Sequence, residues 1–346
     1  MKKKLKILLI NNAYPTAHYP KKGGYIKSIE ECLKEADFFV DKLVLKNTKG
    51  NKTQKIISYV RFYLDLFFFQ KYSRYDYIFI HHFPYVFFPL IFSFWKMKQV
   101  VVNFHGEDIV FTSSFSKALN NLSYMFLSTR FKYIFPSNYF KDKASSVIHK
   151  LNFSEKFVSP SGGVDTSIFK PLNEKPNISN IINIGFASGM VHNKGVEDLI
   201  SLLSDFNASS CCFHIIDYGK QRDKYVSSIK AFKNVILYKT FKKEDMPNFY
   251  SKIDVLFFPT KSESLGLVAL EAMSCNVPVI GPDAFALKEI IVDGVTGEKY
   301  NPLENKAYMK AFDTFKENRN KYRPFSFIKE FYSKEQVVNH LKLIFN

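Results

Sequence analysis

The stretch ESLGLVALEAM, Glu263 to Met273, carries two carboxylates eight positions apart in a segment whose other residues are apolar or small. Residues 267–273 have the composition of one buried helix face, and a buried carboxylate is costly unless another group pairs with it. The three residues Ser264, Leu265 and Gly266 would place free N–H groups at the start of that helix, which is a ready anion site. The stretch therefore predicts a turn followed by a helix, with a ligand held between two carboxylates.

The spacing of the two carboxylates narrows the chemistry. Eight helical residues span about 12 Å, whereas the two carboxylates of a retaining glycosidase lie about 5–5.5 Å apart. A different ligand fits better: Glu271 would bind a ribose diol, the turn a diphosphate, and Glu263 the hydroxyls of an attached sugar. The stretch therefore indicates a site for a nucleotide sugar.

Composition indicates a folded protein of more than one domain. A chain of 346 residues suits two domains, and 46% hydrophobic residues, with 37 Phe and 20 Tyr, exclude a disordered protein. The four cysteines show no metal-ligand spacing, and their usage fits a reducing cytoplasm. They are Cys32, Cys211, Cys212 and Cys275.

No membrane-spanning or secretory segment is expected. The start MKKKLKILLINN imitates a signal peptide, but its apolar run is too short and breaks at Asn11-Asn12. The most apolar segment, Phe83 to Trp95, contains two prolines and falls short of the ~20 residues that span a bilayer. We therefore expect a cytoplasmic protein.

The net charge of +17 is concentrated in the first half. Residues 1–165 hold 25 Lys and Arg against 12 Asp and Glu, and residues 166–346 hold 24 against 20. Within the basic half, the segment Lys55 to Tyr75 mixes cations with the aromatic run 67–69, a composition that can lie in a bilayer interface. The alternatives are that its aromatics pack inside the domain, since Asp65 interrupts the apolar face, or that the charge is only a solvated lysine-rich surface. The charge alone also admits nucleic acid, but no nucleic-acid-binding module is visible.

Short apolar runs alternate with amphipathic segments, which is the pattern of βαβ units in a parallel sheet. The pattern stops at KPLNEKPN, residues 170–177, a polar break typical of a linker, and then restarts. The sequence thus predicts an α/β protein of two doubly wound, Rossmann-like domains, 1–170 and 171–325, that face a cleft. Residues 326–346 are expected to form a C-terminal helix that packs back toward the first domain. Predicted strands are Leu5–Ile10, Lys42–Leu45, Tyr77–Ile80, Val100–Phe104, Ile134–Phe135, Phe157–Val158, Ile181–Ile184, Cys212–Ile216, Val235–Leu237, Val255–Phe258 and Val277–Ile280, and predicted helices include Lys27–Ala36, Gln54–Phe69 and Ser333–Phe345.

Small polar motifs follow several of these strands, where ligands bind in such sheets. The pair Gly23-Gly24 precedes a helix, so its backbone can approach a phosphate. His105 follows the strand Val100–Phe104, and Lys194 precedes a helix in FASGMVHNKGVEDL, a segment that also holds Ser188 and Gly189. Each motif alone has an ordinary structural explanation: a turn, a loop histidine or a solvated lysine.

Taken together, the motifs resemble the retaining GT-B glycosyltransferases of family GT4. The resemblance rests on the E-x7-E pattern at Glu263 and Glu271, with SGGVDTSIFKP, HNKGVEDLI, FKKEDMPNFYSKIDVLFFPTKSE and NFHGED in the family's order over nearly the whole chain. It implies a GT-B fold and no metal. It also implies catalytic roles for His105, Glu263 and Lys194. The donor-binding residues that it implies are Gly23, Gly24, Ser188, Gly189, Lys194, Ser264, Leu265, Gly266 and Glu271.

The chain departs from the family at three places. The family's arginine five residues before the lysine is Gly189 here, so one diphosphate charge lacks its usual partner. The glycine after Cys275 is Asn276, and a glycine pair is replaced around Phe285-Ala286, with Glu289 kept.

The resemblance implies a glycosyltransferase that moves a sugar from a UDP- or GDP-sugar to a glycan or lipid-linked acceptor, with retention, in the synthesis of cell-surface polysaccharides or glycoconjugates. The enzyme would need no cofactor and could work at the inner face of the cytoplasmic membrane of a bacterium, bound to anionic lipid. Two alternatives remain open: a GT-B nucleotide-sugar epimerase, and a donor-binding protein with weak catalysis.

Overall fold

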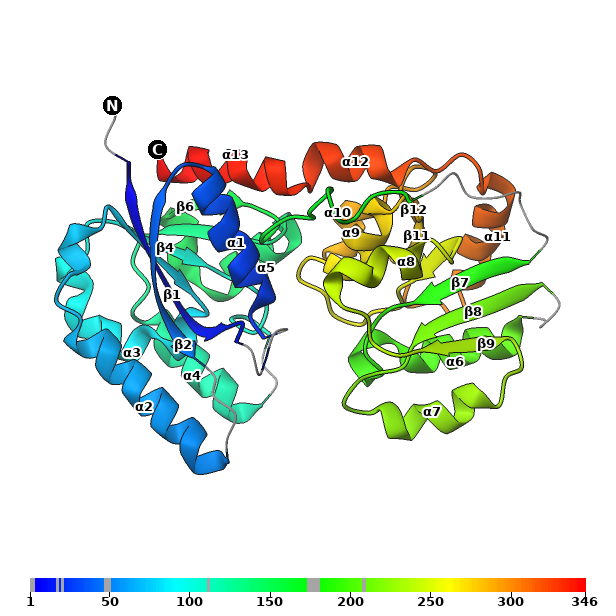
Figure 1. Ribbon diagram of the computed structural model, residues 1–346, viewed down its shortest axis with the longest axis horizontal. Coiled ribbons are helices and arrows are strands. Elements are labelled where there is room, and N and C mark those ends of the chain that lie inside the picture. The colour runs from blue at the N-terminus through cyan, green and yellow to red at the C-terminus, as the bar shows by residue number, and fades with distance from the viewer. Residues whose placement is uncertain are drawn as a thin grey trace. The chain divides into compact units, whose positions relative to one another are not determined.

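The computed structural model divides the chain into two compact units (Figure 1). Unit 1 comprises Met1–Gly163 and Lys334–Asn346, and unit 2 comprises Val164–Ser333. The structure describes residues 4–16, 19, 22–46, 51–110, 113–172, 181–206 and 210–346. Most of the predicted linker 170–177 lies outside these described residues.

Unit 1 is built on a parallel sheet of six strands in the order β2-β1-β3-β4-β5-β6. Strand β2 lies on one side of β1, and β3 to β6 follow in chain order on the other side, as in a doubly wound fold. Its strands are β1 (Lys6–Tyr14), β2 (Phe39–Lys46), β3 (Tyr77–His81), β4 (Val100–Asn103), β5 (Lys132–Phe135) and β6 (Glu155–Val158). Its α-helices are α1 (Gly24–Glu35), α2 (Lys52–Phe68), α3 (Phe87–Leu90), α4 (Ser114–Tyr124), α5 (Asn138–Val147) and α13 (Lys334–Phe345), with 3-10 helices η1 (Tyr72–Arg74), η2 (Phe83–Tyr85), η3 (Ile91–Lys96) and η4 (His149–Phe153).

Unit 2 repeats the architecture with a parallel sheet in the order β12-β11-β10-β7-β8-β9. Its strands are β7 (Ile182–Phe186), β8 (Cys211–Ile216), β9 (Val235–Tyr238), β10 (Val255–Phe257), β11 (Val279–Pro282) and β12 (Gly297–Tyr300). Its α-helices are α6 (Val196–Asp205), α7 (Arg222–Lys230), α8 (Met246–Tyr250), α9 (Leu267–Ser274), α10 (Leu287–Ile290), α11 (Tyr308–Asn318) and α12 (Pro324–Phe331), with 3-10 helices η5 (His192–Lys194) and η6 (Lys243–Asp245). The prediction of two doubly wound domains is therefore confirmed.

Both sheets are covered by helices on both faces, because strand side chains alternate between the faces. In β1, Ile7 and Leu9 join the core beneath α1 and α13, while Leu8 and Ile10 join the core on the opposite face, beneath α2. Unit 2 shows the same alternation in β10: Leu256 packs toward α9 and α12, and Val255 toward α6 and α11. All these side chains are buried, which explains why the strands read as continuous apolar runs.

The unit boundaries differ from the predicted ones, 170/171 and 325/326, because side chains near each crossing pack into a core. Phe169 is buried in the core of unit 2, and its carbonyl accepts a hydrogen bond from Ser274 Oγ at 2.5 Å. Ile328, on α12, belongs to that same core, so the predicted C-terminal segment 326–346 is shared between the units. The chain crosses at Gly163–Val164 and again at Ser333–Lys334, and a β-bridge joins Val164 to Ser333.

Strand β12 was not predicted from the sequence. Gly-Glu-Lys-Tyr has no β-branched run, and the strand lies at the edge of its sheet, where one side needs no partner. Its first residue, Gly297, lies so close to β11 that a Cβ atom would sit 1.8 Å from the carbonyl oxygen of Val279. The glycine that weakens the sequence signal is what lets the strand pair.

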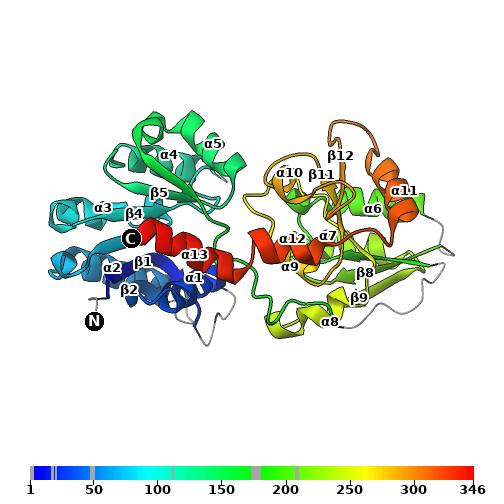
Figure 2. The same cartoon turned by 90° about the horizontal axis from the view of Figure 1, so that it is seen from above.

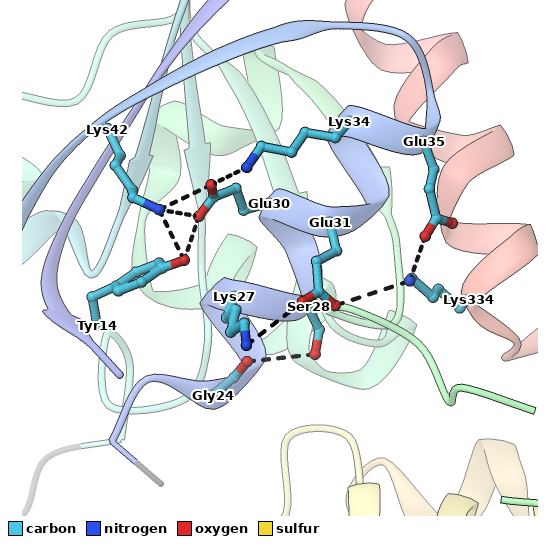
Figure 3. Close-up of polar contacts among 10 residues, drawn as sticks. All are labelled: Tyr14, Gly24, Lys27, Ser28, Glu30, Glu31, Lys34, Glu35, Lys42 and Lys334. Atoms are coloured by element: carbon cyan, nitrogen blue, oxygen red, sulfur yellow. Dashed lines mark hydrogen bonds and ion pairs between the residues drawn. The ribbon is translucent and has the colours of Figure 1, made fainter. Parts of the chain in front are cut away.

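Helix α13 packs beside α1 on unit 1 (Figures 1 and 2). Its last apolar residue, Phe345, is fully buried with its ring centroid 4.9 Å from Tyr77 and 5.2 Å from Phe79. At the other end of the helix, Lys334 pairs with Glu35 at 2.5 Å (Figure 3). The apolar contacts hold α13 to unit 1, since exposed ion pairs contribute little.

A buried carboxylate orients α1 against the sheet. Glu30 accepts hydrogen bonds from Tyr14 at 2.5 Å, from Lys34 at 2.6 Å and from Lys42 at 2.9 Å (Figure 3). Although burial opposes the charge, these donors hold the pKa of Glu30 below its usual value. The cluster ties α1 to both β1 and β2.

The contribution of α13 can be measured with two variants of one helix. Phe345→Ala removes a fully buried ring and should lower the free energy of unfolding by about 3–5 kcal/mol, because unit 1 loses a core contact. Leu343→Ala, on the exposed side of the same helix, should change it by less than about 0.5 kcal/mol. Urea unfolding followed by circular dichroism compares the two; equal effects would mean that α13 is not part of the core of unit 1.

Candidate functional site

The candidate site in unit 2 lies where the loops after β7 and β10 meet. The carbonyl of Asn193 accepts hydrogen bonds from Lys261 N at 2.9 Å and from Thr260 Oγ1 at 3.2 Å. Gly195 makes this approach possible: its φ is 72°, and a Cβ there would lie 2.0 Å from the carbonyl oxygen of Pro259. Any other residue at this position would push the two loops apart.

This approach brings two sequence-predicted residues together. Lys194 Nζ lies 2.7 Å from Glu263 Oε2, and the two side chains are 32% and 15% exposed. The ammonium group also lies 5.6 Å from the ring centroid of Phe258. An anion that reaches Lys194 would compete with Glu263 for it and set that carboxylate free.

The turn before α9 has the form that the sequence predicted. Gly266 is the N-cap, with φ 92° and ψ 47°, so the helix starts at Leu267, and its first N–H groups have no acceptor within the helix. The side chain of Leu265 is buried in the core of unit 2. Among Ser264, Leu265 and Gly266, therefore, Leu265 and Gly266 can offer a ligand only backbone groups.

Glu271 lies on α9 against Tyr250. The hydroxyl of Tyr250, a buried residue of α8, donates to Glu271 Oε2 at 3.3 Å. Burial and, to a smaller extent, the charge of Glu271 raise the pKa of the Tyr218 hydroxyl. Burial raises the pKa of Glu271 to about 7, and the charge of Lys243 and the Tyr250 hydroxyl offset part of that rise. Within the described residues Glu271 has no ion-pair partner, so near neutral pH it can accept hydroxyl donors.

Ser188 and Gly189 lie in the loop at the carboxyl end of β7, which also leads to Lys194. The hydroxyl of Ser188 is buried and has no hydrogen-bond partner among the described residues. A Cβ on Gly189 would lie 3.3 Å from the ring of Tyr218, whose hydroxyl donates to the carbonyl of Ala187. The family's arginine at position 189 would therefore have to pass this ring.

The other two departures from the family fall on left-handed backbone. Asn276 has φ 58° directly after the C-cap of α9, and Phe285 has φ 57°. Glycine is favoured at such positions, and asparagine tolerates them better than other residues. Asn276 therefore keeps the turn, whereas Phe285 accepts backbone strain of about 1–2 kcal/mol.

A separate candidate site in unit 1 is a histidine cluster at the carboxyl ends of β3 and β4. His105 Nε2 lies 2.9 Å from His81 Nδ1, and the two rings stack with centroids 5.1 Å apart. His82 lies beside His105, and its Nε2 is 2.9 Å from the hydroxyl of Tyr25. Its Nδ1 is 3.0 Å from Asn11 Oδ1, within β1. One polar cluster thus joins a residue of β1 to residues at and just after the ends of β3 and β4.

Burial keeps these histidines uncharged. It lowers the pKa of His82 to about 4 and the pKa values of His81 and His105 well below their usual range. Two neutral rings can share the His81–His105 hydrogen bond only if one N–H donates and the other nitrogen accepts. His81 Nε2 is buried without a partner among the described residues, so this cluster has an unused polar atom.

Asp108 closes the loop that carries His105. Its Oδ2 accepts from the backbone N–H of His105 at 2.7 Å. Burial raises the pKa of Asp108 to about 7, although backbone hydrogen bonds act against that rise. Its Oδ1 is buried and has no partner within the described part of the chain. The carboxyl therefore fixes the backbone of His105.

The Gly23-Gly24 turn stands at the start of α1. Gly23 has φ 73°, and a Cβ there would lie 2.9 Å from the carbonyl oxygen of Ala13, whereas a Cβ on Gly24 would meet no atom within 4 Å. Gly23 is thus required by the turn, and Gly24 leaves the helix start open. Among the described residues, no group of three or more His, Cys, Asp or Glu side chains has the arrangement of a metal site.

His81, His82, Tyr218 and Tyr250 were not predicted from the sequence. His81 and His82 directly follow the predicted strand Tyr77–Ile80, just as His105 follows Val100–Phe104, so their position was a usable signal. The two tyrosines carry no such signal, because Tyr250 and Tyr218 interact with Glu271 from 21 and 53 positions away.

Comparison with known proteins gives a family match for part of the chain and a fold for the whole. Residues 170–327 match the family model described as Glycosyl transferases group 1. An uncharacterized 41.2 kDa protein in the cps region of Klebsiella pneumoniae is 31% identical over 44% of this chain and 42% of its own length. An uncharacterized glycosyltransferase of Methanocaldococcus jannaschii is 28% identical over 60% and 56%. The chain thus spans about half the length of these curated relatives, and the family match lies entirely within unit 2.

Solved structures extend the likeness to the whole chain. Sucrose-phosphate synthase from Thermosynechococcus elongatus superposes with a TM-score of 0.78 at 15% identity, over 99% of this chain and 98% of that one. The Anabaena protein HepE in complex with UDP-glucose gives 0.69 at 16% identity, over 98% and 99%. With its two six-stranded parallel sheets, the chain has the GT-B fold.

The raised pKa of Glu271 predicts how stability depends on pH. Between its usual 4.5 and about 7, the folded protein keeps a proton that the unfolded chain has released. The stability contributed by this group therefore falls as pH rises through that window, by about 3 kcal/mol at most. Glu271→Gln removes this loss, so its melting temperature should exceed the parent's at pH 8 and match it near pH 4.5.

The matched control is Glu317→Gln, at an exposed position of α11. It should follow the parent at every pH in a scanning calorimetry series. A Glu271→Gln curve parallel to the parent's would contradict the raised pKa.

Proposed function

We propose that the protein transfers a sugar, with retention, from a nucleoside diphosphate sugar to a hydroxyl group of a glycan or lipid-linked acceptor. The observation that carries the proposal is the Lys194–Glu263 pair beside the open N-terminus of α9, with Glu271 on that same helix. The family match of unit 2 and the GT-B fold support it. So does HepE, a GT-B neighbour whose structure contains UDP-glucose.

Each candidate site residue named in unit 2 has a role in this proposed reaction. Lys194 and the first N–H groups of α9 bind the diphosphate, Glu271 accepts the ribose hydroxyls, and Glu263 accepts hydroxyls of the transferred sugar. For unit 1, the family resemblance assigns His105 to the donor sugar and Gly23-Gly24 to the phosphates. The predicted cleft between the domains stays a prediction.

The reaction itself needs no nucleophile from the protein. The acceptor oxygen forms a bond to the anomeric carbon on the face from which the diphosphate leaves, and the acceptor proton passes to a phosphate oxygen of the leaving group. The protein contributes positioning and stabilises the charge that grows on the diphosphate. Lys194 supplies that charge stabilisation, and no metal is required.

We place the enzyme in the cytoplasm, in the synthesis of bacterial cell-surface polysaccharides or glycoconjugates. All four cysteines are free thiols, which suits a reducing compartment. Among the described helices none is long and apolar enough to cross a membrane.

One observation favours a second candidate. Gly189 occupies the position of the family's phosphate-binding arginine, against the ring of Tyr218. A protein with one cation fewer at the diphosphate could bind the donor and turn it over weakly or not at all. Turnover measurements separate this candidate from the first.

A donor screen tests the proposal directly. A UDP- or GDP-sugar should raise the melting temperature, since a ligand at a hundredfold excess over Kd stabilises by about 2.7 kcal/mol. Addition of a glycan acceptor should then release the nucleoside diphosphate. Epimerised donor without any acceptor would indicate an epimerase, binding without turnover the second candidate, and no stabilisation by any nucleotide sugar would refute all three. Glu271→Gln should weaken nucleotide binding by about 1.5–3 kcal/mol, with Glu317→Gln as its control.

The Lys194 assignment makes a kinetic prediction. Lys194→Ala should lower turnover about tenfold or more, because the lost charge matters most in the transition state. Lys310→Ala, at an exposed position of α11, should turn over like the parent. Activity of the parent should persist in EDTA; a strict Mg²⁺ requirement would contradict the metal-free mechanism.

A further inference from the structure

Helix α2 is apolar on two faces, and only one of them packs against the core. Phe62 and Leu66 are buried beneath it. At about 100° per residue, Val60, Leu64 and Phe67 fall on a second stripe that is roughly opposite the first, and all three are exposed. The polar side chains Arg61 and Asp65 occupy the remaining side. Water therefore faces an apolar surface that the fold does not use.

The same surface continues onto the segment after β3. The ring of Phe67 lies 5.5 Å from that of Phe92 on η3, and 5.1 Å from that of Phe68. Figures 1 and 2 both place α2 beside α3, which runs directly into η3. Trp95, also on η3, is 79% exposed and donates its Nε1–H to the carbonyl of Phe92 at 3.1 Å. We name this surface the aromatic patch and define it by Val60, Leu64, Phe67, Phe68, Phe92 and Trp95.

The segments that form the aromatic patch are rich in cations. Residues 51–76 contain five Lys and Arg against two carboxylates, Asp65 and Asp76, and residues 83–99 contain two lysines, of which Lys98 pairs with Asp76. The ammonium group of Lys96 lies 5.0 Å from the ring of Trp95. Over their full sequences, unit 1 holds 27 Lys and Arg against 12 Asp and Glu, whereas unit 2 holds 22 against 20. The positive charge of the chain is thus gathered in the unit that bears the patch.

From this we propose that the aromatic patch docks unit 1 on the surface of an anionic lipid bilayer, with its rings in the interface and its cations at the headgroups. Large exposed apolar patches mark interaction sites, and an apolar face bordered by Lys and Arg is the combination that an anionic leaflet attracts. A second copy of the chain is a poorer occupant, because two-fold pairing would set these cations against one another.

The test uses Trp95, the one tryptophan of the chain, as a built-in probe. The protein should sediment with phosphatidylglycerol vesicles and much less with phosphatidylcholine vesicles, and should dissociate near about 0.5 M salt, where screening is strong. On phosphatidylglycerol its emission should shift to the blue as the ring leaves water. The assay contains no sugar nucleotide, so its result is independent of the proposed glycosyl transfer.

Two matched variants locate the surface. Phe68→Ser removes a ring that is 64% exposed and should weaken vesicle binding about tenfold, the loss expected for one ring kept in water. Phe153→Ser, at an 80% exposed position on η4 outside the patch, should bind like the parent. Melting curves should coincide, because neither ring is in the core.

Four outcomes would overturn the proposal. They are equal binding to both lipids, no binding to either, binding without a blue shift of Trp95, and equal effects of the two variants. Self-association in the absence of vesicles that Phe68→Ser abolishes would assign the patch to a second copy instead.

Discussion

The arrangement of the candidate donor site depends on one close approach, that of Gly195 to the carbonyl of Pro259. Only 2.0 Å separates a Cβ at position 195 from that oxygen, so the loop after β7 can lie on the loop after β10 only with glycine there. The hydrogen bonds from Thr260 and Lys261 to Asn193 then hold the two loops in register. Lys194 meets Glu263 as a consequence, and the turn into α9 follows from the same loop.

The candidate site in unit 2 contains charged side chains, whereas the histidine cluster in unit 1 is neutral. In unit 2, Lys194 and Glu263 form a partly exposed ion pair, and burial raises the pKa of Glu271 to about 7. In unit 1, His81, His82 and His105 are kept neutral by burial, and hydrogen bonds fix their rings. A charged, exchangeable site suits a diphosphate, whereas a neutral, rigid cluster suits recognition of hydroxyl groups by shape and direction.

Sequence reasoning succeeded where local patterns decide the structure. The alternating apolar runs gave both sheets, because strands buried on two faces are apolar throughout. The turn before α9 was predicted from the E-x7-E segment, because the glycine that ends the turn and the apolar residues that follow it are local sequence features. It failed where distant segments decide: β12 pairs through Gly297, and the unit boundary follows the burial of Phe169 rather than the polar linker. His81 and His82 are a different case: they directly follow the predicted strand Tyr77–Ile80, which is a local signal for a site, but they were not predicted as site residues.

The burial of Glu271 affects both the stability of the protein and its proposed binding of a ligand. Its burial opposes ionisation, and the phenol of Tyr250 at 3.3 Å is a weak compensation for a full charge. A ribose diol would bring two hydroxyl donors to this carboxylate and so favour its ionised form. The free protein therefore carries a cost that a diol removes, which is how a binding site differs from a structural ion pair. If the proposed function is correct, the partner that this carboxylate lacks in an otherwise apolar helix is the ribose diol of the donor.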